Sequence, residues 1–100
     1  MSFELGNYSI ISSLNERTIY IKVIDKITFM CYENNIDMKE LRLNTDLDCA
    51  YQMITNCFNK SPQHIVAVNL ISGVMKMIFN VNVGDFFTMN FEILLREIII

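Results

Sequence analysis

The chain has 100 residues, of which 52% are hydrophobic and 19% are charged, and its formal net charge is −3. This length suits one domain, and an apolar content above the usual value of about 45–50% excludes a disordered chain and predicts a surface sparse in charge. The eight Lys and Arg residues are scattered without a basic stripe, so the sequence argues against a nucleic-acid partner.

Neither a secretory signal nor a membrane segment is expected. Residues 1–14 lack a positive stretch followed by an apolar run, and no segment reaches 18 uninterrupted apolar residues. The three cysteines, Cys31, Cys49 and Cys57, are an odd number without the spacing of a metal site, which fits reduced thiols. We therefore predict a cytoplasmic protein with no membrane partner.

The first part of the chain is predicted to be strand. Residues 1–7 form either a short edge strand or an ordered lead-in, and residues 8–14 and 18–25, rich in β-branched side chains, form a hairpin around a polar turn at 15–17.

The next part is expected to continue the sheet. A tight reversal at 25–26 leads to a third strand at 27–33 and a loop at 33–37, because Asn and Asp favour loops. Residues 39–43 alternate charged and apolar side chains and predict a short amphipathic strand.

One helix is predicted, over about residues 46–59. Its apolar positions recur at three- and four-residue spacing: Leu47, Ala50, Tyr51, Ile54, Cys57 and Phe58. Thr45 is expected to cap the start with its hydroxyl, while Asp46 and Asp48 suit the positive end of the helix dipole. Pro62 follows the end. A helix of this length buries one face only against other elements, so we expect it to lie on a sheet.

The last part is predicted to be an antiparallel meander of three strands. The strands are expected at 64–70, 74–81 and from 86 to about 95, with turns at 72–73 and 82–85. Alternation assigns one face of the middle strand to the core, namely Met75, Met77, Phe79 and Val81. The end of the chain also fits a helical face formed by Phe91, Leu94, Leu95 and Ile98, so the pattern leaves both structures open there.

These elements predict an α+β fold. Residues 1–100 are expected to form a single globular domain with an antiparallel sheet or sandwich of about six to seven strands and one amphipathic helix between its two halves.

No catalytic or metal-binding constellation is evident. His64 has no neighbouring nucleophile or orienting carboxylate, and Cys49 and Cys57 lack the further ligands that zinc requires. Asp46 and Asp48 are explained by their place at the start of the helix. We therefore expect a protein that is not an enzyme and holds no cofactor or metal.

The segments IYIKVIDKITFMCYE, DLDCAYQMITNCF and SGVMKMIFN, together with the final FFTMNFEILLRE, resemble the small N-terminal head domain of coiled-coil proteins from mimivirus-like giant DNA viruses. In layout the chain also resembles the heads of the centriole cartwheel protein and of the DNA end-joining scaffold, which carry a helical pair where one helix is predicted here. The resemblance implies a head that leads into a coiled coil, in host cytoplasm or a virion.

The predicted function is a non-enzymatic oligomerisation or scaffold head of a viral protein. The resemblance and the uncapped apolar end of the chain assign self-association to five residues: Phe91, Ile93, Leu94, Leu95 and Ile98. A homo-oligomer is the expected state. The alternative function is a module that binds a protein or peptide at an exposed sheet edge, either 39–43 or 8–14.

Overall fold

The structure of the protein is a computed structural model that describes residues 1–59, 64–83 and 87–98. These described ranges contain seven strands and two helices, which confirms the α+β class. In chain order the elements are β1 (Ser2–Leu5), β2 (Tyr8–Leu14), β3 (Ile19–Asp25), β4 (Cys31–Ile36), α1 (Met38–Leu41), α2 (Leu47–Phe58), β5 (His64–Ile71), β6 (Val74–Val83) and β7 (Phe87–Glu97).

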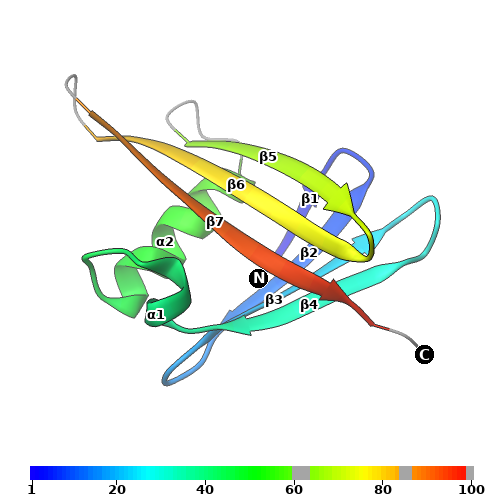
Figure 1. Cartoon of the computed structure of the whole chain (residues 1–100), viewed down its shortest axis with the longest axis horizontal. Coiled ribbons are helices and arrows are strands. Elements are labelled where there is room, and N and C mark those ends of the chain that lie inside the picture. The colour runs from blue at the N-terminus through cyan, green and yellow to red at the C-terminus, as the bar shows by residue number, and fades with distance from the viewer. Residues whose placement is uncertain (60–63, 84–86, 99–100) are drawn as a thin grey trace.

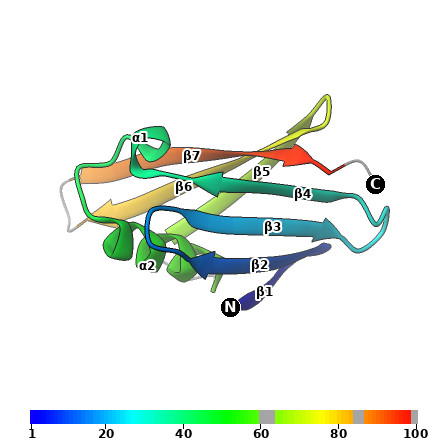
Figure 2. The same ribbon diagram turned by 90° about the horizontal axis from the view of Figure 1, so that it is seen from below.

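The strands form one antiparallel sheet in the order β1-β2-β3-β4-β7-β6-β5. The sheet curls into a half-barrel, with β1 to β4 on one side and β5 to β7 on the other (Figure 1). Helix α2 contacts β1, β5 and β6, so it covers the open side between the two edge strands (Figure 2).

The predicted hairpin and meander are both confirmed. β2 pairs with β3 along its length, starting beside the turn with Leu14 opposite Ile19. β5 pairs with β6 in the same way, starting with Ile71 opposite Val74. β6 extends to Val83, two residues beyond the predicted end, so residues 82–83 of the predicted turn belong to this strand; residues 84–85 of that turn and the predicted strand start at 86 lie outside the described residues.

The third strand begins later than predicted, because the reversal after β3 is a loop and not a tight turn. The Oδ1 atom of Asp25 accepts hydrogen bonds from the backbone N–H groups of Ile27 and Thr28, and Phe29 has a φ of 62°. β4 therefore starts at Cys31 and includes residues 33–36, so the predicted loop there is wrong. Asn34 is accommodated because its side-chain amide donates to the carbonyl oxygen of Leu94 at 2.9 Å.

The predicted strand at 39–43 is also wrong, because this segment begins with helix α1. The Asp37 carboxylate caps the helix by accepting from the Glu40 N–H at 2.9 Å, and Arg42 ends it in left-handed geometry with a φ of 55°. The described chain thus has a helical pair where one helix was predicted. In α2 the cap is Asp46, which accepts from the Cys49 N–H at 2.7 Å, and not Thr45.

The core lies between the curled sheet and α2. The predicted inward face of β6 is confirmed, since Met75, Met77, Phe79 and Val81 are all buried, and so are Ala50, Ile54, Cys57 and Phe58 of α2. In β7 alternate residues face the core, which settles the end of the chain as a strand through Glu97.

Candidate interaction surfaces

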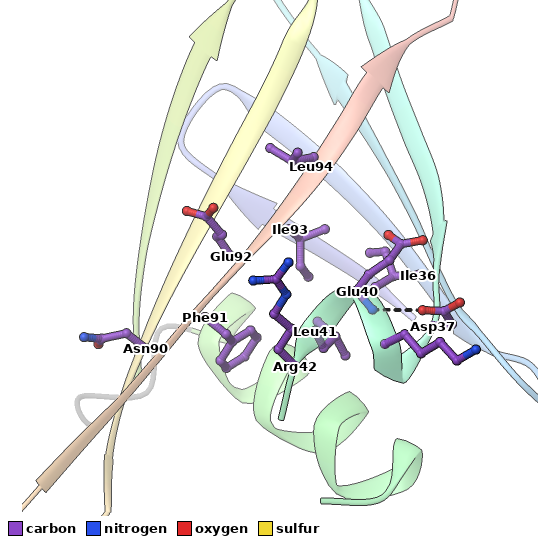
Figure 3. Close-up of a pocket in the computed structure, with 11 residues that line it drawn as sticks. Ile36, Asp37, Glu40, Leu41, Arg42, Asn90, Phe91, Glu92, Ile93 and Leu94 are labelled. Atoms are coloured by element: carbon purple, nitrogen blue, oxygen red, sulfur yellow. Dashed lines mark hydrogen bonds between the residues drawn. The ribbon is translucent and has the colours of Figure 1, made fainter. Parts of the chain in front are cut away.

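The sheet has a seam between β4 and β7. In the described chain these two strands pair only near the end of β7, where residues 31–33 meet residues 96–98, and toward the start of β7 they diverge. Helix α1 packs beside β7 in the space that this divergence opens. The result is a cavity of about 700 Å³, which we call the α1–β7 groove, lined by residues 36–37, 39–42 and 90–94 (Figure 3).

One edge of the β7 backbone faces this groove. The Glu97 N–H donates to the carbonyl oxygen of Gly73, on the β6 side, whereas the Ile98 N–H donates to the carbonyl oxygen of Cys31, on the β4 side. Along an antiparallel strand the N–H and C=O groups of successive residues point to opposite sides. The backbone groups of the even-numbered β7 residues therefore point toward β4. Among the described residues, Asn90 and Glu92 therefore point N–H and C=O groups into the groove with no strand opposite them.

The carboxylates around the groove are already engaged. Asp37 caps α1, Glu40 accepts a hydrogen bond from the Asn34 amide at 3.4 Å, and Glu92 forms an ion pair with Lys76 at 3.1 Å. Lys39 and Arg42 are exposed and form no ion pair within the described part of the chain. A neutral N–H donor does not cancel the charge of a carboxylate, so the groove carries charges of both signs, and Lys39 and Arg42 are the charged side chains there without a partner among the described residues.

Apolar side chains form the floor of the groove. Four of the lining side chains are buried: Ile36, Leu41, Phe91 and Ile93. Leu94 lies at the edge of the groove, with half of its surface exposed. Figure 3 shows the Arg42 side chain extending from the end of α1 toward β7. A ligand here would contact an apolar floor, a polar strand edge and charged side chains of both signs, of which the two cations lack a partner in the described chain.

A second surface surrounds the end of β7. The bonds from Glu97 to Gly73 and from Ile98 to Cys31 place the β5–β6 turn and the β3–β4 loop on either side of this strand end. Figure 1 shows both turns at the same end of the molecule as the end of β7. Five large apolar side chains are exposed on the β3–β4 loop and at the end of β5, and we call them the C-terminal rim: Ile27, Phe29, Met30, Leu70 and Ile71.

The five residues predicted to mediate self-association fall into two groups. Phe91, Ile93 and Leu95 face the core of their own chain and are at most 7% exposed. Leu94 is 50% exposed, and Ile98 is partly buried next to β4. Only the second group presents surface to a partner, and the role in self-association stays a prediction.

The sheet edges differ from those expected for peptide binding. Residues 8–14 form β2, which is paired on both sides with β1 and β3, and residues 39–43 include helix α1. The prediction that either is an open edge is therefore wrong. The open edge of β7 was not predicted, because it depends on two strands that lie about 60 residues apart in the sequence.

The groups considered for chemistry do not come together. His64 starts β5, while Cys31, Cys49 and Cys57 are half-buried, exposed and buried, respectively. Within the described ranges, no three His, Cys, Asp or Glu side chains are grouped as a metal site would require. Among the same residues, no helix has the length and apolar character needed to cross a membrane.

No family model and no curated protein sequence matches the chain. Its fold is similar to the crystal structure of the head domain of human CCDC61, with a TM-score of 0.81. The chain has the fold of a head domain. The similarity covers 97% of this chain and 94% of that chain at 9% sequence identity, so it concerns the fold alone. It agrees with the resemblance to cartwheel-type heads predicted from the sequence.

Proposed function

We propose that this protein is a non-enzymatic scaffold head that self-associates at its C-terminal end. The observation that carries the proposal is the C-terminal rim, where Ile27, Phe29 and Ile71 are 67%, 78% and 67% exposed around the end of β7. The head-domain fold supports the scaffold role. The likeness to giant-virus proteins, the single-domain organisation and the cytoplasmic location stay predictions of the sequence.

Self-association is favoured because it removes the exposed apolar side chains of the rim from water. Apolar surface gains roughly 25 cal/mol per Å² when it is buried, and clustered exposed apolar residues mark interaction surfaces. Leu94 and Ile98 adjoin the rim through the strand end, so they join the contact directly. Phe91, Ile93 and Leu95 contribute by anchoring β7 in the core.

Light scattering coupled to size exclusion, over a concentration series, tests the proposal. The wild-type chain should rise from its monomer mass of 11.7 kDa to a defined oligomer. Phe29→Asn and Ile71→Ser should shift this rise to higher concentration, because each removes apolar rim surface; Asn also tolerates the left-handed backbone of Phe29.

Leu14→Ser is the matched control, since Leu14 is 38% exposed on β2 and lies outside the rim. It should leave the association unchanged. A wild-type chain that stays monomeric throughout the series would contradict the proposal, and so would equal effects of the rim and control variants.

A further inference from the structure

We propose that the α1–β7 groove binds an extended peptide segment that carries Asp or Glu, by adding a strand to the open edge of β7. This binding site includes none of the five rim residues, although it shares Leu94 with the proposed self-association contact, and the proposal does not depend on self-association. The partner is defined by its chemistry: an extended backbone that pairs with β7, and a carboxylate that pairs with Arg42 or Lys39.

The backbone of β7 supplies the first argument. The Asn90 and Glu92 N–H and C=O groups face the groove without a strand opposite them in the described chain, and a strand can pair with such an edge by main-chain hydrogen bonds. At the adjoining residue, Leu94, the side-chain amide of Asn34 already acts as a substitute for a neighbouring strand, because it donates a hydrogen bond to the Leu94 carbonyl oxygen. The next positions along the edge lack such a substitute among the described residues.

The size and floor of the groove supply the second argument. A volume of about 700 Å³ falls in the range of ligand sites, and five consecutive residues of β7 line it. Five strand residues span roughly 17 Å, the length of a short extended peptide. The buried Leu41, Phe91 and Ile93 form an apolar floor, which suits a peptide with apolar residues at alternate positions.

The charged side chains of the groove indicate which group on a peptide can pair with them. All three carboxylates at the groove have partners, whereas Lys39 and Arg42 have no carboxylate partner among the described residues. A guanidinium and a carboxylate form a bidentate pair that is stronger than a neutral hydrogen bond. A peptide carboxylate is therefore the group that can pair with the unpartnered donors of Lys39 and Arg42.

Arg42 also occupies a position that the backbone reserves for other residue types. Its φ of 55° is left-handed geometry, where Gly or Asn is normally preferred at the end of a helix. A residue with a long side chain in this geometry is uncommon, which makes the Arg42 side chain a candidate for a functional role. Figure 3 shows that this side chain extends toward β7, across the groove.

The experiment is a selection from a displayed library of random eight-residue peptides on the folded full chain. Selected peptides should contain Asp or Glu between alternating apolar or β-branched residues. With a synthetic peptide of the selected sequence, hydrogen exchange at the Asn90 and Glu92 amides should slow. Exchange at Phe91 and Ile93 should change little, since those amides already face β6.

Variants of Arg42 separate the groove from other surfaces. Arg42→Gly should weaken peptide binding about fivefold to tenfold through loss of a charge-assisted pair, while the fold is retained because glycine suits the left-handed position. Arg42→Glu should weaken it further. Arg17→Gly removes the same charge from the exposed β2–β3 turn and should leave binding unchanged.

Three outcomes would overturn the proposal. One is a library that yields no binder above background. Another is a peptide whose binding neither slows exchange at Asn90 and Glu92 nor responds to Arg42→Glu. The third is slowed exchange at these amides on raising the protein concentration without peptide, which would identify a second copy of the chain as the occupant. The rim variant Phe29→Asn should bind the peptide normally, so an absence of peptide binding can be told apart from an absence of self-association.

Discussion

The three cysteine side chains stand in different environments, and this decides their chemistry. Cys49 is exposed on α2, whereas Cys57, on the same helix, is 1% exposed in the core. Burial raises the pKa of the Cys57 thiol to about 12 from its ordinary value of 9.0, because the charged thiolate is poorly solvated there. Cys57 is thus a small apolar core residue and not a nucleophile.

The raised pKa of Cys57 makes the stability of the protein depend on alkaline pH. Below pH 9 the thiol is neutral in both states, and its stabilising effect is fully present. As the pH rises from 9 toward 12, the thiol ionises in the unfolded chain first, so the free energy of unfolding should fall. Urea unfolding at pH 7, 9 and 10.5 measures this decline.

Two cysteine variants check the source of that decline. Cys57→Ala should show a shallower fall above pH 9, whereas Cys49→Ala should keep the wild-type slope because Cys49 is exposed. Tyr20 contributes a remaining slope, because its hydroxyl donates to Glu33 at 2.6 Å and this bond raises the pKa of Tyr20 to about 12. Identical slopes in all three proteins would refute the assignment to Cys57.

Two of the left-handed residues carry exposed side chains at the two interaction surfaces. Phe29, with a φ of 62°, presents a ring that is 78% exposed at the C-terminal rim, and Arg42, with a φ of 55°, reaches across the α1–β7 groove. Glycine or asparagine would satisfy the backbone better at both positions. Backbone geometry alone therefore does not explain the residue types at these two positions.

At the scale of single elements, α2 has the clearest division between a buried and an exposed face. Ile54 is 0% exposed, while Asn56 on the same helix is exposed. Ile54→Asp places an unpaired charge in the core, which costs several kcal/mol against a total stability of about 5–15 kcal/mol, so the domain should unfold. Circular dichroism and thermal melting measure the loss.

Asn56→Asp is the control for Ile54→Asp, since it adds the same charge to the same helix on the exposed face. It should fold with a melting temperature close to that of the wild type. An Ile54→Asp protein that melts like the control would show that Ile54 does not lie in the core.

The sequence predicted elements well where one simple period governed them. β2, β3, β5 and β6 were each found within about two residues, because apolar residues alternate along them between turn-forming residues. The failures lie at 27–43, where side-chain bonds to the backbone decide the structure. Asp25 closes a loop and Asp37 caps a short helix, and neither bond follows from apolar periodicity.

The groove was beyond sequence reasoning for a different reason. Its walls come from α1 and β7, and it exists because β4 and β7 pair at one end and diverge at the other. The alternation of charged and apolar residues at 39–43 predicted a strand in this segment, which instead begins with helix α1. None of the five rim residues was predicted: the sequence pointed to the apolar end of the chain, and the β3–β4 loop and the β5–β6 turn bring the rim beside it only in the folded chain.

At the scale of the whole molecule, a row of aromatic rings joins the two sides of the half-barrel. Phe58 of α2 contacts Phe3 of β1 with ring centroids 5.5 Å apart and Phe79 of β6 at 5.7 Å, and Phe79 stacks on Phe91 of β7 at 4.9 Å. β4 and β7 share few residue pairs in the described chain, so the aromatic row is a second connection between β1 to β4 and β5 to β7.

Removal of the Phe58 ring should therefore destabilise both sides of the half-barrel together. Phe58→Ala should cost about 3–5 kcal/mol of unfolding free energy, because it leaves a cavity where α2 meets β1 and β6. Urea unfolding followed by amide NMR signals should show β2 and β6 losing structure at one lowered midpoint. Phe29→Ala, which removes a ring that is 78% exposed, should leave the midpoint nearly unchanged. If β2 kept its signals after β6 had lost them, the two sides would be independent, and the aromatic row would not be the coupling between them.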